Sequence, residues 1–271
     1  MRKRIIIPIV LAYVASPIHD DSFLNFNPII EVCVADKIDE KKLNFPEINF
    51  DYKINGKEVH LYNFDPEFVN LEVLILNKPR TADKFLEKAK NKYGDKLEFL
   101  TTLGYYDIRS GEPVGRINID GKIVARGCYD GGVYLINSSN RFRTDKSIEG
   151  IELSKNEWYH GGFGSLVIDS KIDVEETRRR NLEYFVKKPR TALVIYKNYS
   201  CGLVFYTGNF SDFAHGLLGL NLGVKDAVTL DSGNSRYFAF KNRGLENEPF
   251  TVLKQANKER AISSMLCGYL K

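Results

Sequence analysis

The sequence predicts an α+β protein in which a mostly antiparallel or mixed β-sheet carries a few packed helices. Strand-like runs outnumber helical ones, and Asn-Gly and Asp-Gly turns join several of them, which is typical of antiparallel hairpins. A single strand–helix–strand unit is expected over residues 202–231. Strands gathered in hairpins, with few helices between them, favour α+β over an alternating α/β arrangement.

Length and composition allow one main domain with a sizeable core. The chain has 271 residues, of which 43% are hydrophobic and 27% are charged. We expect an N-terminal extension over residues 1–56 and a main domain over residues 57–271. The net charge of +4 comes from interspersed residues, so a nucleic-acid binder is not indicated. No apolar run is long enough to predict a transmembrane helix.

The first 16 residues resemble a signal peptide. Met1–Arg4 is basic, Ile5–Val14 is apolar, and Ala12–Ser16 has the small residues of a cleavage site. We therefore expect export from the cytoplasm. The alternative is a cytoplasmic protein in which the apolar run of residues 5–14 is a buried first strand.

The cysteines and acidic residues predict no cofactor. Cys33, Cys128, Cys201 and Cys267 are far apart and form no CxxC pair, so a zinc site is not expected. They allow two disulfides or four free thiols. No metal-binding spacing occurs, although a divalent metal held by Asp226 and Asp231 stays an alternative.

The first third of the chain predicts a loop-rich segment followed by strands. Residues 17–56 are rich in loops, and Ile29–Val34 has the apolar run of a strand. The Asn-Gly pair in Ile54–Lys57 is typical of a two-residue hairpin turn. Strands are expected at Lys57–Asn63 and Val69–Asn77, whose residues alternate or run apolar.

A helix is predicted over Thr81–Tyr93, where apolar side chains share one face. Thr81 can cap its start, and Gly94 can end it. The apolar run Leu97–Leu103 is then a strand that leads into the turn-rich loop Gly104–Pro113.

The middle of the chain predicts a meander and a glycine-rich turn. Residues 138–156 are polar and predict a loop, and the glycines of Tyr159–Ser165 predict a turn before a strand at Leu166–Asp169. No lysine and no helix follow these glycines, so a phosphate-binding P-loop is not indicated. The strands of the meander are Val114–Ile119, Lys122–Cys128 and Val133–Asn137.

The last third predicts the strand–helix–strand unit and a helical tail. The tail is expected to hold a helix over Asn257–Cys267. The preceding elements are strands at Ala192–Lys197, Gly202–Thr207, Ala227–Leu230 and Tyr237–Phe240, and a helix at Phe210–Leu222.

Asp231 is the strongest single candidate for a functional residue. It ends the apolar run Ala227–Leu230, and the small polar residues Ser232–Ser235 follow it. A carboxylate at the end of a buried strand, beside a polar turn, is well placed to meet a small ligand. The alternative is an ordinary hairpin in which the aspartate caps its own turn.

Three short segments resemble the phosphodiester glycosidase domain family. Leu103–Asp107 with Gly111–Gly115 resembles its NGGYF and GEPVG motifs, Arg190–Ala192 resembles its RTA motif, and Leu222–Asp231 resembles its LGAxDALNLD motif. The segments occur in the family's order, within a resemblance that covers residues 57–245. It implies a hydrolase that cleaves a sugar from a sugar-1-phosphodiester or a related cell-surface glycan, as the uncovering enzyme of this family does.

The resemblance also implies roles for individual residues. Arg190 is expected to hold the phosphate, because a guanidinium fork can bind two phosphate oxygens. Asp231 is expected to stabilise the oxocarbenium-like centre or to activate water. Glu112 and Asp107 are candidate partners of Asp231, and His160 is either a proton donor or a structural histidine. The expected substrate-binding residues are Gly104, Tyr106, Asp107, Arg190, Ser232, Asn234 and Ser235.

The chain departs from the family pattern at four positions. Thr102, Thr207, Thr229 and Ser232 replace amide, carboxylate or glycine groups that could contact a ligand. These changes motivate an alternative, a non-catalytic carbohydrate- or envelope-binding protein on the same fold. A third hypothesis is a surface or viral structural protein whose tyrosine-rich loops contact a partner protein.

Overall fold

The computed structural model describes residues 47–271, apart from 108–109, 111, 128–131, 140, 178–187, 232–235, 242–249 and 255–261. The signal-like segment of residues 1–16, the predicted strand Ile29–Val34, Cys33 and Cys128 lie outside the described residues. Export and the state of those two cysteines therefore stay predictions. Cys201 and Cys267 are both buried free thiols.

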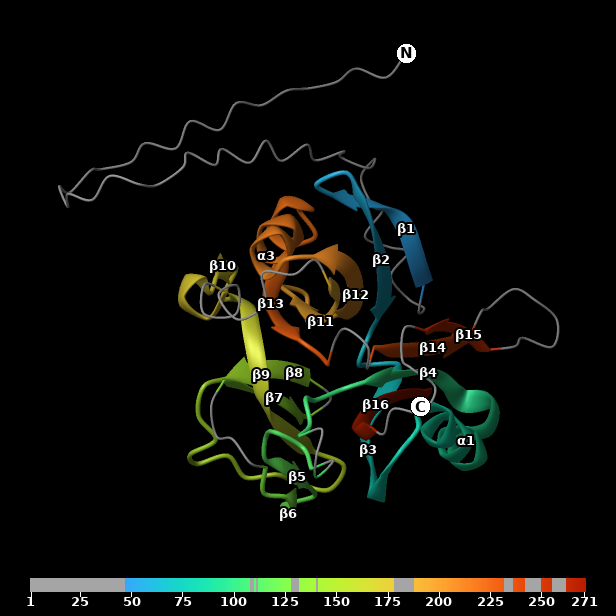
Figure 1. Ribbon diagram of the computed structural model, residues 1–271. Coiled ribbons are helices and arrows are strands. Elements are labelled where there is room, and N and C mark those ends of the chain that lie inside the picture. Colours follow the sequence, from blue (N-terminus) through green and yellow to red (C-terminus); the bar gives the residue numbers. More distant parts are fainter. Residues whose placement is uncertain are drawn as a thin grey trace.

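Two antiparallel sheets dominate the fold (Figure 1). The larger has 11 strands, ordered β1-β2-β12-β11-β13-β9-β5-β6, with β10 and the pair β7–β8 attached through β9. The smaller has five strands, ordered β15-β14-β4-β16-β3. The α+β class is therefore confirmed in a sheet-dominated form.

The bounds of the larger sheet's strands are β1 Glu47–Ile54, β2 Lys57–Phe64, β5 Ile117–Ile119, β6 Lys122–Ala125, β7 Val133–Ser138, β8 Arg141–Asp145, β9 Trp158–Ile168, β10 Lys171–Ile172, β11 Lys188–Tyr196, β12 Cys201–Gly208 and β13 Val224–Thr229. Those of the smaller sheet are β3 Val69–Arg80, β4 Leu97–Thr102, β14 Tyr237–Lys241, β15 Phe250–Lys254 and β16 Ile262–Leu270. The helices are α1 Ala82–Tyr93, the short 3₁₀ turn η2 Gly94–Lys96, and α3 Phe210–Gly219.

The two sheets and two helices bury three apolar layers. The largest layer lies between the sheets and includes Leu193, Phe205 and Phe238. A second layer packs α3 against the larger sheet, and a third packs α1 against the smaller one. Figure 1 shows α1 and α3 on separate sides of the molecule, each next to its own sheet. Alternate residues of one strand therefore face different layers, as the twofold strand period requires.

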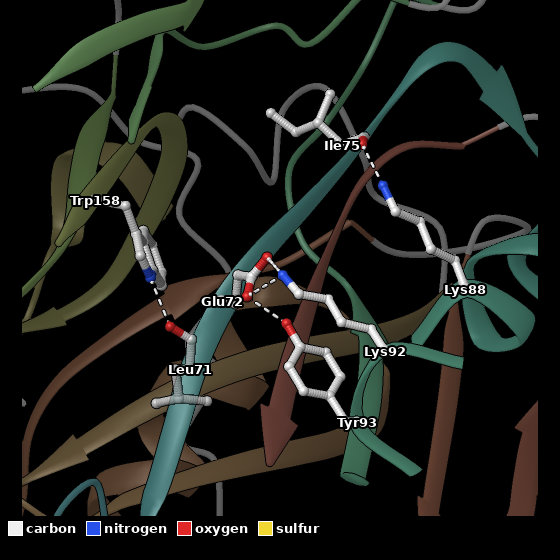
Figure 2. Close-up of polar contacts among 7 residues, drawn as sticks. All are labelled: Leu71, Glu72, Ile75, Lys88, Lys92, Tyr93 and Trp158. Carbon is white, nitrogen blue, oxygen red and sulfur yellow. Dashed lines mark hydrogen bonds and ion pairs between the residues drawn. The ribbon is translucent and has the colours of Figure 1, made fainter. Parts of the chain in front are cut away.

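Polar contacts of β3 join the smaller sheet to helix α1 and to strand β9 of the larger sheet (Figure 2). Glu72 accepts hydrogen bonds from Lys92 Nζ and from the Tyr93 hydroxyl, at the end of α1. On the adjacent residue, the Leu71 carbonyl accepts a hydrogen bond of 3.0 Å from the Trp158 indole Nε1–H of β9. Trp158 therefore ties the larger sheet to the smaller one.

Two predicted hairpin turns are confirmed. Asn55 and Gly56 both have positive φ, of 49° and 70°, between β1 and β2. Asp120 and Gly121 do the same, with φ of 54° and 75°, between β5 and β6. Positive φ at both central residues is typical of the type I′ turn, whose twist matches that of antiparallel strands. The first hairpin lies across the predicted boundary after residue 56, and β1 is hydrogen-bonded to β2 of the larger sheet.

The glycine-rich segment Tyr159–Ser165 was predicted to form a turn. It is instead part of the continuous 11-residue strand β9. Its glycines allow close approach of other backbone segments and rings. A Cβ atom on Gly161 would lie 2.6 Å from the Tyr134 ring, and one on Gly115 would overlap the backbone of Gly161. The glycines are required because the strand is crowded by neighbouring backbone and rings, and not because the chain reverses there.

Three further predictions were wrong. The predicted tail helix is absent over Ile262–Cys267, because Ile262–Leu270 forms strand β16 between β3 and β4, where most of its residues are buried. Residues 257–261 of that predicted helix lie outside the described residues. Residues 138–156 contain the strand β8 rather than only a loop. The expected meander is also broken, since β7 pairs with β8 and β9, and β5 pairs with β6 and β9. In each case, long-range pairing outweighed the local pattern.

No helix within the described part of the chain is long and apolar enough to cross a membrane.

Replacing Trp158 by Phe is expected to lower the free energy of unfolding by about 1–3 kcal/mol, because the buried Leu71 carbonyl loses its donor. The measurement is urea denaturation followed by far-UV circular dichroism, since Trp158 is the chain's single tryptophan. Tyr199→Phe, at an exposed position, is the control and should change stability by less than about 0.5 kcal/mol. Equal stabilities of the Trp158→Phe variant and the wild type would contradict this role.

Candidate active site

The register of β11 with β13 brings Arg190 and Asp231 together. Ala192 pairs with Thr229, and the Leu230 N–H donates to the Thr191 carbonyl at 2.9 Å. The same register continued by one residue sets Arg190 beside Asp231. Both side chains are buried, with exposed fractions of 4% and 6%. Directly opposed residues of an antiparallel pair have Cβ atoms about 5 Å apart and project from the same face.

Arg190 is held on the face of the larger sheet that α3 covers. Its Nε–H donates to the Gly208 carbonyl at 3.2 Å, at the end of β12. Its guanidinium carbon lies 3.9 Å from the centre of the Phe210 ring, in the first turn of α3. One hydrogen bond and one aromatic face thus fix the plane of the guanidinium group. Such a group loses little freedom when it binds an anion.

The chain that leaves β4 crosses to Asp231. The Asp231 N–H donates to the Leu103 carbonyl at 3.0 Å. Two residues later, the Tyr105 hydroxyl donates to Thr229 Oγ1 at 3.2 Å. Residues 103–105 therefore connect the smaller sheet to the end of β13. The contacts of Leu103 with Asp231 and of Tyr105 with Thr229 were both missed by the sequence argument.

The loop after Tyr105 is a hairpin. The Val114 N–H donates to the Tyr105 carbonyl, and the Asp107 N–H donates to the Glu112 carbonyl at 2.9 Å. Tyr106 and Pro113 form an isolated bridge between these two pairs. The Asp107 carboxylate accepts from the Ser110 N–H at 2.9 Å, as a turn-capping aspartate does. Glu112 is exposed, whereas Tyr106 and Asp107 are half-buried.

Gly104 and His160 are in contact below this hairpin. A Cβ atom on Gly104 would overlap the His160 imidazole, so a larger residue cannot occupy this position without displacing the ring. His160 Nδ1 lies 2.8 Å from the Gly161 carbonyl, and Nε2 lies 3.3 Å from Ser264 Oγ. A carbonyl can only accept, so we assign the proton to Nδ1, and Nε2 accepts from the serine hydroxyl. His160 therefore supports the residue that leads into the hairpin.

Burial keeps His160 neutral. The side chain has no exposed surface, and burial lowers the pKa of the imidazole to about 4, despite the hydrogen bond to the Gly161 carbonyl. Desolvation penalises the charged form of a histidine and so lowers its pKa. At neutral pH, the imidazole is uncharged.

Tyr206 is a second residue that the sequence argument missed. It pairs with Arg190 across β11 and β12, and its ring stacks on Phe213 of α3. Its hydroxyl is buried and has no hydrogen-bond partner among the residues that the structure describes. Burial and the nearby Asp212 carboxylate raise the pKa of the phenol to about 12. The sequence predicted the strand Gly202–Thr207 that holds Tyr206, but it gave no signal that this side chain pairs with Arg190.

Other predicted site residues lie elsewhere or outside the described residues. Ser232, Asn234 and Ser235 fall outside them. Asp226 accepts from the Asp169 N–H at 2.9 Å, and it stands five residues before Asp231, which is on the order of 15 Å of extended chain. Within the described residues, no group of three or more His, Cys, Asp or Glu side chains could hold a metal ion.

The fold and the site define a sheet-dominated protein that presents a buried arginine and aspartate at the ends of neighbouring strands. The sequence matches the family model of phosphodiester glycosidases over residues 95–268, which is more than half of the chain and includes both side chains. The chain therefore belongs to the phosphodiester glycosidase family. A comparison with curated protein sequences finds no match.

Solved structures share the fold. The catalytic domain of zebrafish N-acetylglucosamine-1-phosphodiester α-N-acetylglucosaminidase, auto-inhibited by its pro-peptide, is 19% identical with a TM-score of 0.61, over 89% of this chain and 88% of that one. A hypothetical protein from Synechocystis is 11% identical with a TM-score of 0.55, over 83% of this chain and 61% of that one. At these identities, the likeness establishes the fold.

The depressed pKa of His160 predicts a loss of stability in acid. The unfolded histidine takes up its proton near pH 6.5, and the folded one near pH 4, so protonation favours the unfolded state between these values. The resulting loss is roughly 3 kcal/mol as the pH falls from about 7 to about 4. Urea denaturation across this range measures it, with the pKa of His160 followed by NMR.

His160→Asn is the matched variant, because its amide can still donate to the Gly161 carbonyl but does not titrate. It should be less stable than the wild type at pH 7 and should lose about 3 kcal/mol less between pH 7 and 4. A His160 resonance that titrates near pH 6.5 would overturn the prediction.

Proposed function

We propose that this protein is a hydrolase that cleaves a sugar from a sugar-1-phosphodiester or a related cell-surface glycan. The observation that carries the proposal is the register that sets Arg190 beside Asp231 at the ends of β11 and β13. Membership of the phosphodiester glycosidase family supports it. The zebrafish protein that shares the fold is named as an N-acetylglucosamine-1-phosphodiester glycosidase, which supports the same chemical class.

The proposed mechanism divides the work between the two side chains. The phosphodiester is already a good leaving group, so cleavage of the bond between the anomeric carbon and oxygen needs a cation on the phosphate more than a strong acid. The Arg190 guanidinium, fixed by Gly208 and Phe210, would hold the phosphate and stabilise the charge that develops on it. The Asp231 carboxylate would stabilise the oxocarbenium-like centre or activate the attacking water.

The remaining predicted residues take supporting roles in this proposal. Gly104, seated on the neutral His160 ring, would position the hairpin that carries Tyr106, Asp107 and Glu112. In this arrangement, His160 acts through Gly104 rather than as a proton donor. Glu112, exposed on the hairpin, is proposed as the partner acid. Ser232, Asn234 and Ser235 are proposed to contact the substrate from the turn after Asp231.

Thr229 favours the alternative of a carbohydrate- or envelope-binding protein without catalysis. It stands where the family resemblance expects asparagine, and its hydroxyl is fully used within the protein. Oγ1 donates to the Gly164 carbonyl at 3.2 Å, and accepts from the Gly164 N–H at 3.3 Å and the Tyr105 hydroxyl at 3.2 Å. One donor and two acceptor positions exhaust a hydroxyl group. An amide that could reach a ligand is thus replaced by a group committed to the protein.

Replacing Asp231 by Asn is expected to lower kcat for release of free sugar from methyl N-acetylglucosamine-1-phosphate by about 10²–10⁴-fold. Arg190→Met should lower kcat/KM by about 10²-fold or more, and Arg190→Lys should recover only part of it, because lysine lacks the fork. Glu58→Gln and Arg143→Met, at exposed positions, are the controls whose charge changes match those of Asp231→Asn and Arg190→Met. Full turnover by both site variants would refute the assignment.

Sugar release and ligand binding separate the two functions. Calorimetric titration of the same phosphodiester into wild-type protein, with product analysis after long incubation, gives the distinction. The hydrolase predicts free sugar at a rate that depends on Asp231. The binding protein predicts a saturable heat, lost in Arg190→Met, with no product.

A further inference from the structure

Arg236 is a second arginine near Asp231, and it comes just before β14. Phe238 of β14 pairs with Thr101 of β4, and Tyr237 is bonded to Thr102 through the threonine hydroxyl. The same register places Arg236 alongside Leu103. Because the Leu103 carbonyl also accepts the Asp231 N–H, Arg236 and Asp231 flank the same backbone segment.

Among the described residues, none compensates the charge of Arg236. Within the described part of the chain, its Nε–H is buried without an acceptor, and no carboxylate pairs with the guanidinium group. The nearest favourable contact is the Phe205 ring, whose centre lies 5.9 Å from Cζ, near the outer limit of a cation–π interaction. Burial alone lowers the pKa of Arg236. Arg236 is half-buried, and a partly desolvated cation without an anionic partner is costly, so folded proteins rarely keep one without a use.

Arg236 and Arg190 lie on opposite faces of the larger sheet. Arg190 stacks on Phe210 of α3, on the outer face. Arg236 approaches Phe205, which belongs to the apolar layer between the two sheets. Successive residues of β12 point to opposite faces, and Tyr206, the neighbour of Phe205, belongs to the α3 layer. The two guanidinium groups therefore contact different apolar layers, on opposite faces of the larger sheet.

We infer that Arg236 binds an anionic group of the ligand, distinct from the one that Arg190 holds, so that the preferred ligand carries at least two anionic groups. This inference rests on the proposed function for the role of Arg190, but not on catalysis. It narrows the substrate from any sugar phosphodiester to one with a further phosphate or carboxylate group. Arg236 is thereby a specificity-determining residue.

The test compares two ligands that differ by one anionic group. Glucose 1-phosphate and glucose 1,6-bisphosphate are titrated by calorimetry into the wild type, Arg236→Met and the control Arg126→Met, whose side chain is exposed in the native protein. The wild type should bind the bisphosphate at least 10-fold more tightly than the monophosphate. In Arg236→Met, this ratio should fall to within about threefold of one, with the affinity for glucose 1-phosphate nearly unchanged. Arg126→Met should keep the ratio.

The Tm of the ligand-free protein separates a binding role of Arg236 from a structural one, because loss of a structural role would lower the Tm. Methionine keeps the apolar length of the side chain and removes the uncompensated charge, so the Tm of Arg236→Met should equal or exceed that of the wild type. A lowered Tm, an unchanged bisphosphate preference, or no binding of either ligand would overturn the inference. Sugar release that depends on Arg190 and Asp231 but not on Arg236 would leave the hydrolase standing and reject this inference alone. If the protein releases no sugar but Arg236→Met loses the bisphosphate preference, the hydrolase proposal is rejected and the inference about Arg236 stands.

Discussion

The pairing of β11 with β12 on one side and β13 on the other is the constraint on which the site depends. This register fixes Arg190 opposite Tyr206 and beside Asp231, and it brings the Gly208 carbonyl within reach of the arginine. A shift of one residue would turn every side chain of β11 to the other face. It would then exchange the side chains that β11 contributes to the two apolar layers and move Arg190 into the layer between the sheets. The free energy that holds the register is therefore the same burial that stabilises the core.

The smaller sheet contributes to the site through its backbone. Leu103 leaves β4 and accepts the Asp231 N–H, and the register of β14 with β4, continued beyond Phe238, places Arg236 on the other side of Leu103. Gly104 follows it and can pass because it lacks a Cβ atom next to His160. The position of the acid thus depends on how the two sheets pack, and Trp158 helps to fix that packing.

Much of the fold followed from local signals, and the rest required long-range contacts. The Asn55-Gly56 and Asp120-Gly121 turns, helix α1 and the start of α3 follow from residue types whose preferences are local. The tail strand β16 was missed because its pairing partners β3 and β4 are more than 150 residues away. Residues 159–165 misled because glycine marks both turns and crowded strands.

The site, like the fold, was predictable only where local sequence motifs carried the information. Arg190 and Asp231 could be chosen from motif order, and their juxtaposition then rests on the sheet register. Tyr105, Tyr206 and Arg236 could not, because each gains its meaning from a neighbour distant in sequence: Thr229, Arg190 and Leu103, respectively. The exposure of Glu112 and the burial of His160 were likewise invisible, since both depend on tertiary packing.

The most direct test of the account is a crystal structure with a non-hydrolysable sugar 1-phosphonate, which cannot be cleaved at the anomeric bond. The account predicts phosphonate oxygens within hydrogen-bond distance of the Arg190 guanidinium and the anomeric carbon beside the Asp231 carboxylate. A phosphonate bound elsewhere, with Arg190 and Asp231 both out of contact with it, would contradict the claim that these two side chains form one site.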